Sequence, residues 1–355
     1  MTPSKSYFRK RVLKFRKEFP SMGIDGFIIE NPIDIAYFTS LKLSRGRLLI
    51  SKRAVVLFVD GRYTIQAKKG SPFPVKKLGN DELGAVLKSW VGTKYFGFDT
   101  GLSIAAHQSF KSIFTKHKKK LKGFDQPTLK VRAVKDSKEL VALKKSAGLL
   151  WKGFEHIRKK LKEGVSEIEI SREFEFYVKK LGAEALSFEP IVAFGENSAL
   201  PHYHSGARKL KKGDVVLLDI GVVLNGYASD MTRIVFFGKV SKQIEELYQV
   251  VKSAHKAALQ KCMAGEVVAN LDKAARKAMG KEEKHFVHAL GHGIGLNVHE
   301  YPRISSELRK VKLEEGMVIT IEPGLYLPGI GGIRYEDMIV ITKTGYRNFF
   351  KETRP

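Results

Sequence analysis

The stretch Val215-Val-Leu-Leu-Asp-Ile-Gly-Val-Val-Leu-Asn-Gly-Tyr-Ala-Ser-Asp-Met-Thr-Arg-Ile-Val-Phe-Phe237 decides how the later part of this 355-residue chain folds. Asn225-Gly226 lies between two runs rich in β-branched residues. Asn-Gly in that setting is typical of a two-residue type I′ hairpin turn. Such a turn pairs Leu224 with Tyr227, so the sequence predicts a long antiparallel hairpin.

Two aspartates fall on one face of this hairpin. Counting outward from the turn, Asp230 faces Gly221. The same count places Asp219 opposite Thr232. Because side chains alternate with a period of two, Asp219 and Asp230 are diagonal neighbours, with Cα atoms roughly 7–8 Å apart. Two carboxylates in apolar strands are costly to bury, so either divalent cations lie between them or both occupy the wet end of the hairpin.

Histidines and glutamates follow in three later segments. The segment His288-Ala-Leu-Gly-His-Gly-Ile-Gly-Leu-Asn-Val-His-Glu300 carries three histidines among glycines and apolar residues, a density typical of a functional site. Ile319-Thr-Ile-Glu-Pro-Gly324 and Gly331-Gly-Ile-Arg-Tyr-Glu-Asp337 each place a glutamate in or after an apolar strand. Cys262 is the only cysteine, which excludes a thiolate cluster. Carboxylates with histidine suit Mn²⁺, Co²⁺, Fe²⁺ or Zn²⁺.

Taken in order, five short motifs resemble those of the pita-bread metallopeptidases, which include methionine aminopeptidase, aminopeptidase P and prolidase. The motifs are Leu-Asp-Ile-Gly, Ser-Asp-Met-Thr-Arg, Gly-His-Gly-Ile-Gly, Ile-Glu-Pro-Gly and Arg-Tyr-Glu-Asp. The resemblance implies an α+β pita-bread catalytic domain and two divalent metal ions, with Mn²⁺ preferred and Co²⁺, Fe²⁺ or Zn²⁺ as alternatives. The implied metal ligands are Asp219, Asp230, His292, Glu322 and Glu336.

The resemblance also implies a role for each ligand. Asp219 resembles the bidentate ligand of one metal. Asp230 and Glu336 resemble the bridging carboxylates. His292 and Glu322 would complete the shell of the second metal, and Glu322 would also be catalytic by taking the proton of the attacking water.

Three further histidines match active-site positions of the same group. Leu200-Pro-His-Tyr203 resembles the segment that carries a proton-shuttling histidine, here His202. His299 matches a second active-site histidine. Both would be catalytic by donating hydrogen bonds to the scissile carbonyl and its developing negative charge. His288 matches a third histidine, which we assign to substrate binding.

Two arginines complete the expected site. Arg303 resembles a residue that binds the substrate carboxylate in microbial prolidases, and a positive group suits that role. Its alternative is a solvated loop residue. Arg334 precedes Glu336 by two positions and is expected to orient that carboxylate from outside the metal shell. Its alternative is a surface position on a strand.

The earlier part of the chain predicts a small α/β domain. Strands are expected at 26–30, 48–50, 55–59 and 95–98. Asn31-Pro-Ile-Asp-Ile-Ala-Tyr-Phe-Thr39 and Asp60-Gly-Arg-Tyr63 resemble the creatinase-type domain, which methionine aminopeptidases lack. We therefore expect a creatinase-like N-terminal domain over residues 1–128 and the catalytic domain over residues 129–355.

Charge and composition limit the classes of partner and the location that we expect for this protein. The chain has 63 Lys and Arg against 37 Asp and Glu, a net charge of +26. Without a recognisable nucleic-acid-binding motif, a solvated basic surface explains this charge better than nucleic acid does. No apolar run approaches the roughly 18 residues of a membrane span. A single cysteine and no apolar leader favour a reducing, cytoplasmic location.

The favoured function is hydrolysis of the peptide bond before proline by a Xaa-Pro dipeptidase (prolidase). Aminopeptidase P, a Xaa-Pro aminopeptidase, is the alternative, since it cuts the same bond in longer peptides. A non-catalytic pita-bread scaffold that binds an acidic partner is a more distant one, because such scaffolds usually lose ligands. Creatinase, which uses the fold without metal, lacks the five-ligand set. The substrate would be a proline-containing peptide, and relatives imply a homodimer.

Overall fold

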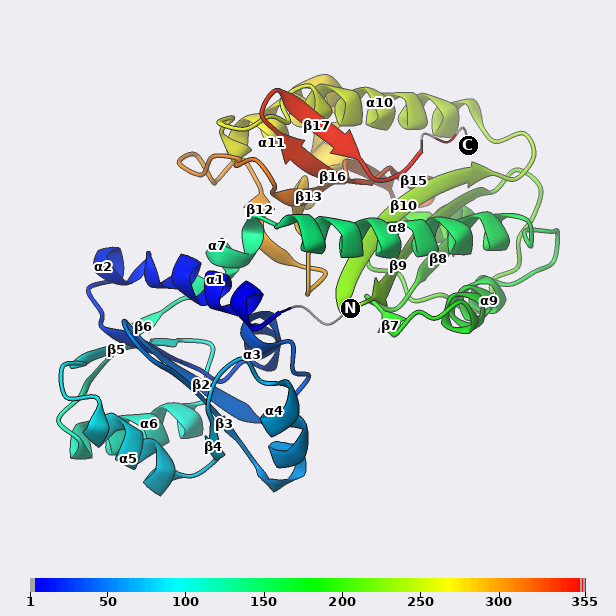
Figure 1. Cartoon of the computed structure of the whole chain (residues 1–355). Helices are drawn as coiled ribbons and strands as arrows, with labels where there is room; N and C mark the ends of the chain where they lie inside the picture. The colour runs from blue at the N-terminus through cyan, green and yellow to red at the C-terminus, as the bar shows by residue number, and fades with distance from the viewer. Residues whose placement is uncertain (1–3, 352, 354) are drawn as a thin grey trace. The chain divides into compact units, whose positions relative to one another are not determined.

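The computed structural model describes residues 4–351, 353 and 355 (Figure 1). The chain forms two compact units, and the division falls between Val131 and Arg132, inside helix α7 (Pro127–Ala133). Each unit has its own sheets and its own apolar core. Among the described residues, none of the helices has the length and apolar character that crossing a bilayer requires.

The first unit is built on a six-stranded sheet in the order β4-β3-β2-β1-β5-β6. Its strands are β1 (Gly26–Ile29), β2 (Gly46–Ser51), β3 (Val55–Val59), β4 (Val75–Lys77), β5 (Tyr95–Asp99) and β6 (Lys120–Phe124). The four apolar strands expected from the sequence are the central ones. The two edge strands, β4 and β6, escaped prediction because they are short, lysine-rich and largely exposed.

Helices surround this sheet. They are α1 (Lys5–Arg16), α2 (Phe19–Met22), α3 (Pro32–Thr39), η1 (Gly61–Tyr63), α4 (Thr64–Gly70), α5 (Asn80–Ser89) and α6 (Ile104–Lys116). Asn31 accepts hydrogen bonds from the backbone N–H groups of Ile33 and Asp34, so Asn31-Pro32 starts α3 as well as ending the strand before it.

The second unit has two pairs of long helices. They are α8 (Ser137–Arg158), α9 (Glu167–Lys180), α10 (Lys242–Leu259) and α11 (Val268–Met279). A capping box of Asp136 and Glu139 starts α8, and one of Ser166 and Glu169 starts α9. Within this unit, α8 and α9 lie on one side of the β-structure and α10 and α11 on the other (Figure 1).

The β-structure between these helices consists of several sheets. Its elements are β7 (Ala185–Leu186), β8 (Ile191–Phe194), η2 (Gly195–Ala199), β9 (Val215–Leu224), β10 (Tyr227–Phe236), η3 (Gly280–His285), β11 (Gly291–Gly293), β12 (Glu300–Ile304), β13 (Val318–Ile321), β14 (Gly324–Leu327), β15 (Gly331–Arg334), β16 (Asp337–Thr342) and β17 (Gly345–Asn348). The orders are β10-β9-β7 with β8 also on β9, β12-β11-β13-β16-β17, and β14-β15.

Strand β9 is apolar at almost every position because it is covered by a core on each face. Leu218 belongs to the core cluster under α8 and α9, whereas Leu217 belongs to the cluster under α10 and α11. Both faces of the strand are therefore buried, as in sheets covered on both sides. Asp219 shares the face of Leu217, so it interrupts the second cluster with a carboxylate.

Candidate metal centre

The β9–β10 hairpin has the predicted register. Leu224 pairs with Tyr227 across Asn225-Gly226, and the pairing continues without a bulge. Asp230 lies opposite Gly221. A Cβ atom on Gly221 would lie 2.6 Å from the Ser229 carbonyl oxygen, so only glycine fits opposite this aspartate. The hairpin prediction is thus confirmed in turn, register and facing.

The glycines around His292 allow its strand to approach its neighbours. A Cβ atom on Gly291 would lie 2.1 Å from the Thr320 carbonyl oxygen in β13. One on Gly293 would lie 2.2 Å from the Tyr301 carbonyl oxygen in β12. The Gly-His-Gly pattern therefore places His292 between two closely packed strands.

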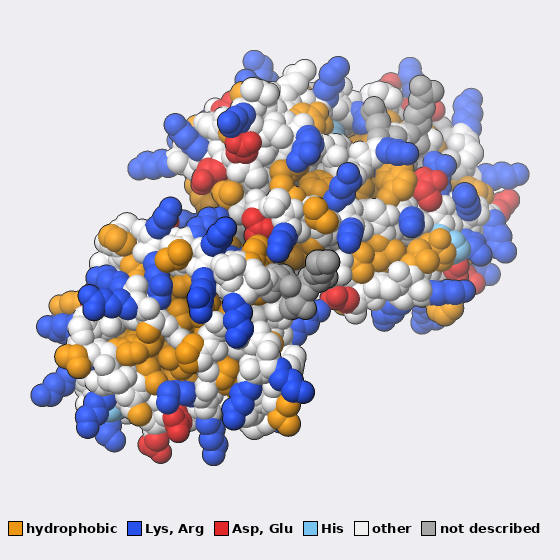
Figure 2. Space-filling view, in the orientation of Figure 1, with side chains coloured by type: hydrophobic (Ala, Val, Ile, Leu, Met, Phe, Trp, Pro, Cys, Tyr) orange, Lys and Arg blue, Asp and Glu red, His pale blue; other side chains and the backbone are white. Residues whose placement is uncertain are grey.

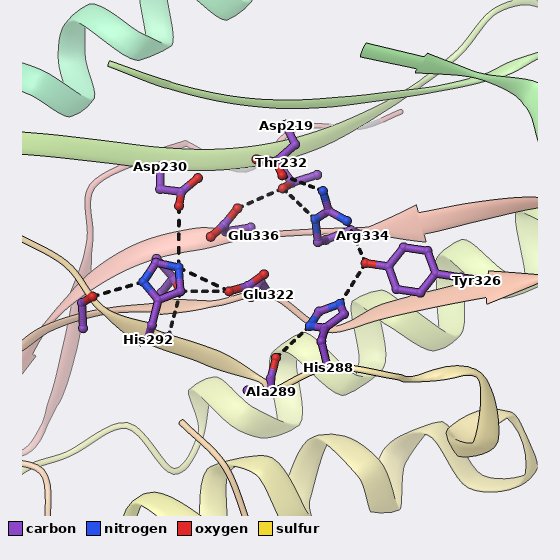
Figure 3. A network of polar contacts seen from close by, with 12 residues as sticks. Asp219, Asp230, Thr232, His288, Ala289, His292, Glu322, Tyr326, Arg334 and Glu336 are labelled. Carbon is purple, nitrogen blue, oxygen red and sulfur yellow. Dashed lines mark hydrogen bonds and ion pairs between the residues drawn. The ribbon is translucent and has the colours of Figure 1, made fainter. Parts of the chain in front are cut away.

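Three of the expected ligands converge on one point. Ligand atoms of Asp230, His292 and Glu336 all lie within 4.8 Å of one another. His292 Nε2 lies 3.6 Å from Asp230 Oδ2 and 3.4 Å from Glu322 Oε1 (Figure 3). His292 Nδ1 donates to the Gly293 carbonyl at 3.0 Å, so the lone pair of the neutral ring is on Nε2, the atom that faces the carboxylates.

The fifth expected ligand, Asp219, lies beside this group. It faces Thr232 across the hairpin, and the Thr232 hydroxyl donates to Glu336 Oε2 at 2.8 Å. Asp219 also raises the pKa of Glu336, which places the two carboxylates within electrostatic range. Figure 3 shows the side chains of Asp219, Asp230, Glu322 and Glu336 pointing toward one another. They come from β9, β10, the end of β13 and the start of β16.

This group of carboxylates is poorly satisfied by the protein itself. Among the described residues, one buried oxygen on each of Asp219, Asp230 and Glu336 has no hydrogen-bond partner. Burial, followed by the charge of Asp219, raises the pKa of Glu336 to about 8. Burial and Glu336 together raise the pKa of Asp230 well above its ordinary value. Divalent cations would supply partners for these oxygens, so the residues fit a metal centre.

Arg334 bonds directly to Asp219, and its expected role in orienting Glu336 stays a prediction. It is 3% exposed, so the surface alternative is wrong. Its guanidinium donates to Asp219 Oδ2 at 2.5 Å and to the Thr232 hydroxyl at 3.2 Å. The Thr232 hydroxyl links Arg334 to Glu336, and the charge of Arg334 also lowers the pKa of Glu336. The hydrogen bond from the guanidinium to a carboxylate, however, goes to Asp219.

Thr232 and Tyr326 were missed by the sequence reading. Thr232 shares a strand face with Asp230, so the period of two could have found it. The Tyr326 hydroxyl has two hydrogen-bond partners: it accepts from Arg334 Nη1 at 2.7 Å and lies 2.8 Å from His288 Nε2 (Figure 3). No local pattern signals this tyrosine, because its partners lie on other segments.

The histidines outside the ligand set have different surroundings. His288 uses both ring nitrogens within the protein: Nδ1 donates to the Ala289 carbonyl, and Nε2 faces Tyr326. The His299 ring stands edge-on to His292, with centroids 4.4 Å apart, while the residue itself is exposed. Desolvation of the ring by its neighbours and then the nearby His202 lower the pKa of His299. His202 is exposed and lies within electrostatic range of both His288 and His299.

Arg303 lies on the same strand pair as a metal-centre residue. It is paired with His292 across β12 and β11, so the two side chains leave the same face. Arg303 is exposed, and among the described residues its side chain has no hydrogen bond or ion pair. It therefore has a free guanidinium near the centre.

The fold and the site together define a metallopeptidase: a two-unit chain whose second unit buries a carboxylate–histidine cluster between two helix pairs. The chain belongs to metallopeptidase family M24, which it matches over residues 141–343. Residues 11–134 match the Creatinase/Prolidase N-terminal domain. The pita-bread and creatinase-type resemblances are confirmed.

Relatives extend over almost the whole chain. The Xaa-Pro dipeptidase of Pyrococcus furiosus is 33% identical over 350 residues, covering 98% of this chain and 99% of the relative. The solved structure of a Xaa-Pro dipeptidase from Bacillus anthracis matches with a TM-score of 0.93 and 33% identity, covering 98% of this chain and 99% of that one. An X-Pro aminopeptidase from Thermotoga maritima matches with a TM-score of 0.85 and 32% identity, covering 96% and 99%.

Proposed function

We propose that this protein is a Xaa-Pro dipeptidase that uses two divalent metal ions to hydrolyse the peptide bond before proline. The observation that carries the proposal is the buried group of Asp230, His292 and Glu336, whose ligand atoms lie within 4.8 Å of one another. Relatives named Xaa-Pro dipeptidase that match nearly the full chain support the substrate class.

The metals would be held by the side chains around this group, with Mn²⁺ as our preferred ion. The proposed ligands are Asp219, Asp230, His292, Glu322 and Glu336. When bound, the ions would supply Lewis acidity and lower the pKa of a water molecule towards neutrality. Oxygen-rich ligands with one imidazole suit Mn²⁺ as well as Co²⁺, Fe²⁺ and Zn²⁺, so the ion must be identified by measurement.

The chain's own residues perform the remaining steps. Burial, then the charge of Glu336, raises the pKa of Glu322, which suits it to accept the proton of the attacking water and pass it to the leaving amine. His299 and His202 would donate hydrogen bonds to the scissile carbonyl oxygen as negative charge develops there. The Arg334 contact to Asp219 would hold that carboxylate in one orientation.

The free guanidinium of Arg303 favours a dipeptide substrate. In a Xaa-Pro dipeptide the carboxylate directly follows the proline, close to the cleaved bond, and a charged hydrogen bond could bind it there. In a longer peptide that position is a neutral amide. Xaa-Pro aminopeptidase activity stays the second candidate, because the Thermotoga maritima X-Pro aminopeptidase has an identity of 32%, close to that of the dipeptidases.

A scaffold that binds an acidic partner has less support. Figure 2 shows Lys and Arg side chains scattered over the visible faces of both units, without the single stripe typical of a nucleic-acid site. The buried carboxylates would also have no purpose in a scaffold. A homodimer and a cytoplasmic location remain our proposals, the second supported by Cys262 as the single, buried, free cysteine.

A substrate panel tests this function. The protein, stripped of metal and reloaded with Mn²⁺, would be assayed on Xaa-Pro dipeptides, Xaa-Pro-Yaa tripeptides and an Ala-Ala control. We expect metal-dependent cleavage of the Xaa-Pro bond, with the highest kcat/KM on dipeptides. A preference for tripeptides would favour the aminopeptidase, and no cleavage by a metal-loaded protein would support the scaffold.

A further inference from the structure

The proposed catalytic histidine His202 lies in an irregular segment. Residues 200–209 contain no helix and only an isolated bridge at Lys209. His202 itself is exposed, so packing of its own ring does not fix it. Its position therefore depends on the contacts that hold the backbone on either side. On the N-terminal side of His202, the Pro201 carbonyl accepts a hydrogen bond from Arg334 Nη1 at 3.5 Å.

A fully buried glutamate, Glu167, holds the backbone on both sides of His202. Glu167 is 0% exposed and is the first residue of α9. Its Oε1 accepts hydrogen bonds from the Phe194 N–H at 2.8 Å and Asn197 Nδ2 at 2.9 Å. Its Oε2 accepts from the Tyr203 hydroxyl at 2.7 Å and the Gly206 N–H at 3.2 Å. One carboxylate thus ties together both ends of the segment that carries the histidine.

The carboxylate is not needed to cap its own helix. Ser166 and Glu169 already form the capping box of α9. The nearby cation, Arg208, is paired in a two-pronged contact with Asp214, at 2.8 and 2.9 Å. All four hydrogen-bond donors to the Glu167 carboxyl come from residues 194–206, so this buried side chain is spent on holding that segment.

We propose that Glu167 is a positioning residue, which holds His202 at the metal centre by fixing the segment from Phe194 to Gly206. Tyr203 carries the effect, because it adjoins His202 and its hydroxyl donates to Glu167. Asn197 Nδ2 also donates to the Tyr203 hydroxyl at 2.8 Å, which closes the network. This inference rests on the proposed function, in which His202 acts on the substrate.

The substitution Glu167→Gln tests the proposal with little change of shape. Glutamine replaces one acceptor oxygen with a donor that faces other donors, so the segment loses its common anchor. We expect kcat on a Xaa-Pro dipeptide to fall about 10- to 100-fold, the effect of a catalytic group displaced by about 1 Å. KM and metal content should change little, since Glu167 contacts no proposed ligand.

A double-mutant cycle with His202→Ala separates positioning from general damage. If Glu167 acts through His202, removing the histidine abolishes the effect of the second change, and the double variant is no slower than His202→Ala alone. Losses that multiply in the double variant would overturn the proposal. So would a Glu167→Gln enzyme with wild-type kcat.

Glu139→Gln is the matched control. Glu139 is also buried near the start of a helix and accepts a hydrogen bond from a tyrosine, Tyr227, at 3.0 Å; this tyrosine and Asp136, whose N–H also donates to Glu139, both lie outside residues 194–206. We expect a comparable loss of thermal stability in both glutamine variants. Only Glu167→Gln should lose kcat.

Hydrogen exchange gives a readout that needs no activity. In Glu167→Gln, amide exchange should become faster across residues 194–206 and stay unchanged in β9 and β10. Unchanged exchange in that segment would refute the anchoring even if the enzyme is slow. If the wild-type protein cleaves no Xaa-Pro peptide, the proposed function fails separately, and the exchange result still decides whether Glu167 orders the segment.

Discussion

Arg303→Ala should distinguish a dipeptidase from an aminopeptidase. The side chain is exposed and makes no hydrogen bond or ion pair among the described residues, so its removal breaks no internal contact. Folding and metal binding should therefore be unaffected, and any loss should report on the substrate alone. The strand pairing with His292 places Arg303 on the same face of the strand pair as that proposed ligand.

The size of the effect follows from the exposure of the guanidinium. A hydrogen bond to a charged group contributes about 1.5–3 kcal/mol, and each 1.4 kcal/mol is about tenfold in kcat/KM. Solvent screens an exposed cation, which moves the loss to the lower end of this range. We expect kcat/KM for a Xaa-Pro dipeptide to fall about 10-fold, and up to about 100-fold if the bound substrate excludes water from the pair.

The assay compares two substrates and two variants. Initial rates would be measured on Ala-Pro and on Ala-Pro-Ala, with Arg309→Ala as the control, because Arg309 is exposed but lies outside strand β12. The tripeptide should lose much less than the dipeptide, and the control should lose nothing on either. Equal small losses on both substrates in Arg303→Ala would refute the carboxylate contact and favour Xaa-Pro aminopeptidase activity.

Three further outcomes are expected. Asp230→Asn should weaken metal binding by about 100-fold or more, because mutating residues that only support metal ligands already lowers metal affinity about 10- to 100-fold. Nearly all activity should be lost with the metal. A variant that keeps two metals and full activity would exclude Asp230 as a ligand. His202→Ala should lower kcat by roughly 10²–10³-fold, measured beside metal content by elemental analysis, and a parallel loss of metal would make it a ligand instead. In the metal-free protein, burial raises the pKa of Glu336 from 4.5 to about 8. Between these two values the folded state keeps a proton that the unfolded state releases. The free energy of unfolding should therefore fall as the pH rises through that window. Thermal unfolding in the presence of a chelator at pH 5.5 and 8 measures this loss of stability. The loss should be smaller in Asp230→Asn, which removes part of the charge repulsion around Glu336. An equal loss in that variant would contradict the assignment.

Local signals in the sequence were sufficient for the hairpin. Asn225-Gly226 determines the turn, and the period of two then determines every partner along β9 and β10, including Gly221 opposite Asp230. The capping boxes that start α8 and α9 were equally readable. These features depend on residues close in the chain, whose geometry a few dihedral angles settle.

The edges of the first unit were harder to read. Strands β4 and β6 carry lysines where a buried strand would carry apolar side chains, so their pattern resembles a loop. What makes them strands is pairing with β3 and β5, to which they contribute backbone hydrogen bonds. Pairing with an existing sheet edge depends on the neighbour rather than on the strand's own sequence.

The sequence alone was sufficient to give the order of the candidate ligands, the common face of Asp219 and Asp230, and the exclusion of a thiolate cluster. Only the tertiary structure decided which partner each polar group takes: Arg334 bonds Asp219, and Glu167 holds the segment of His202. These contacts join positions that are 115 and 36 residues apart. The physical reason is that buried charges must find partners wherever packing brings donors together, and no periodicity along the chain encodes that meeting point.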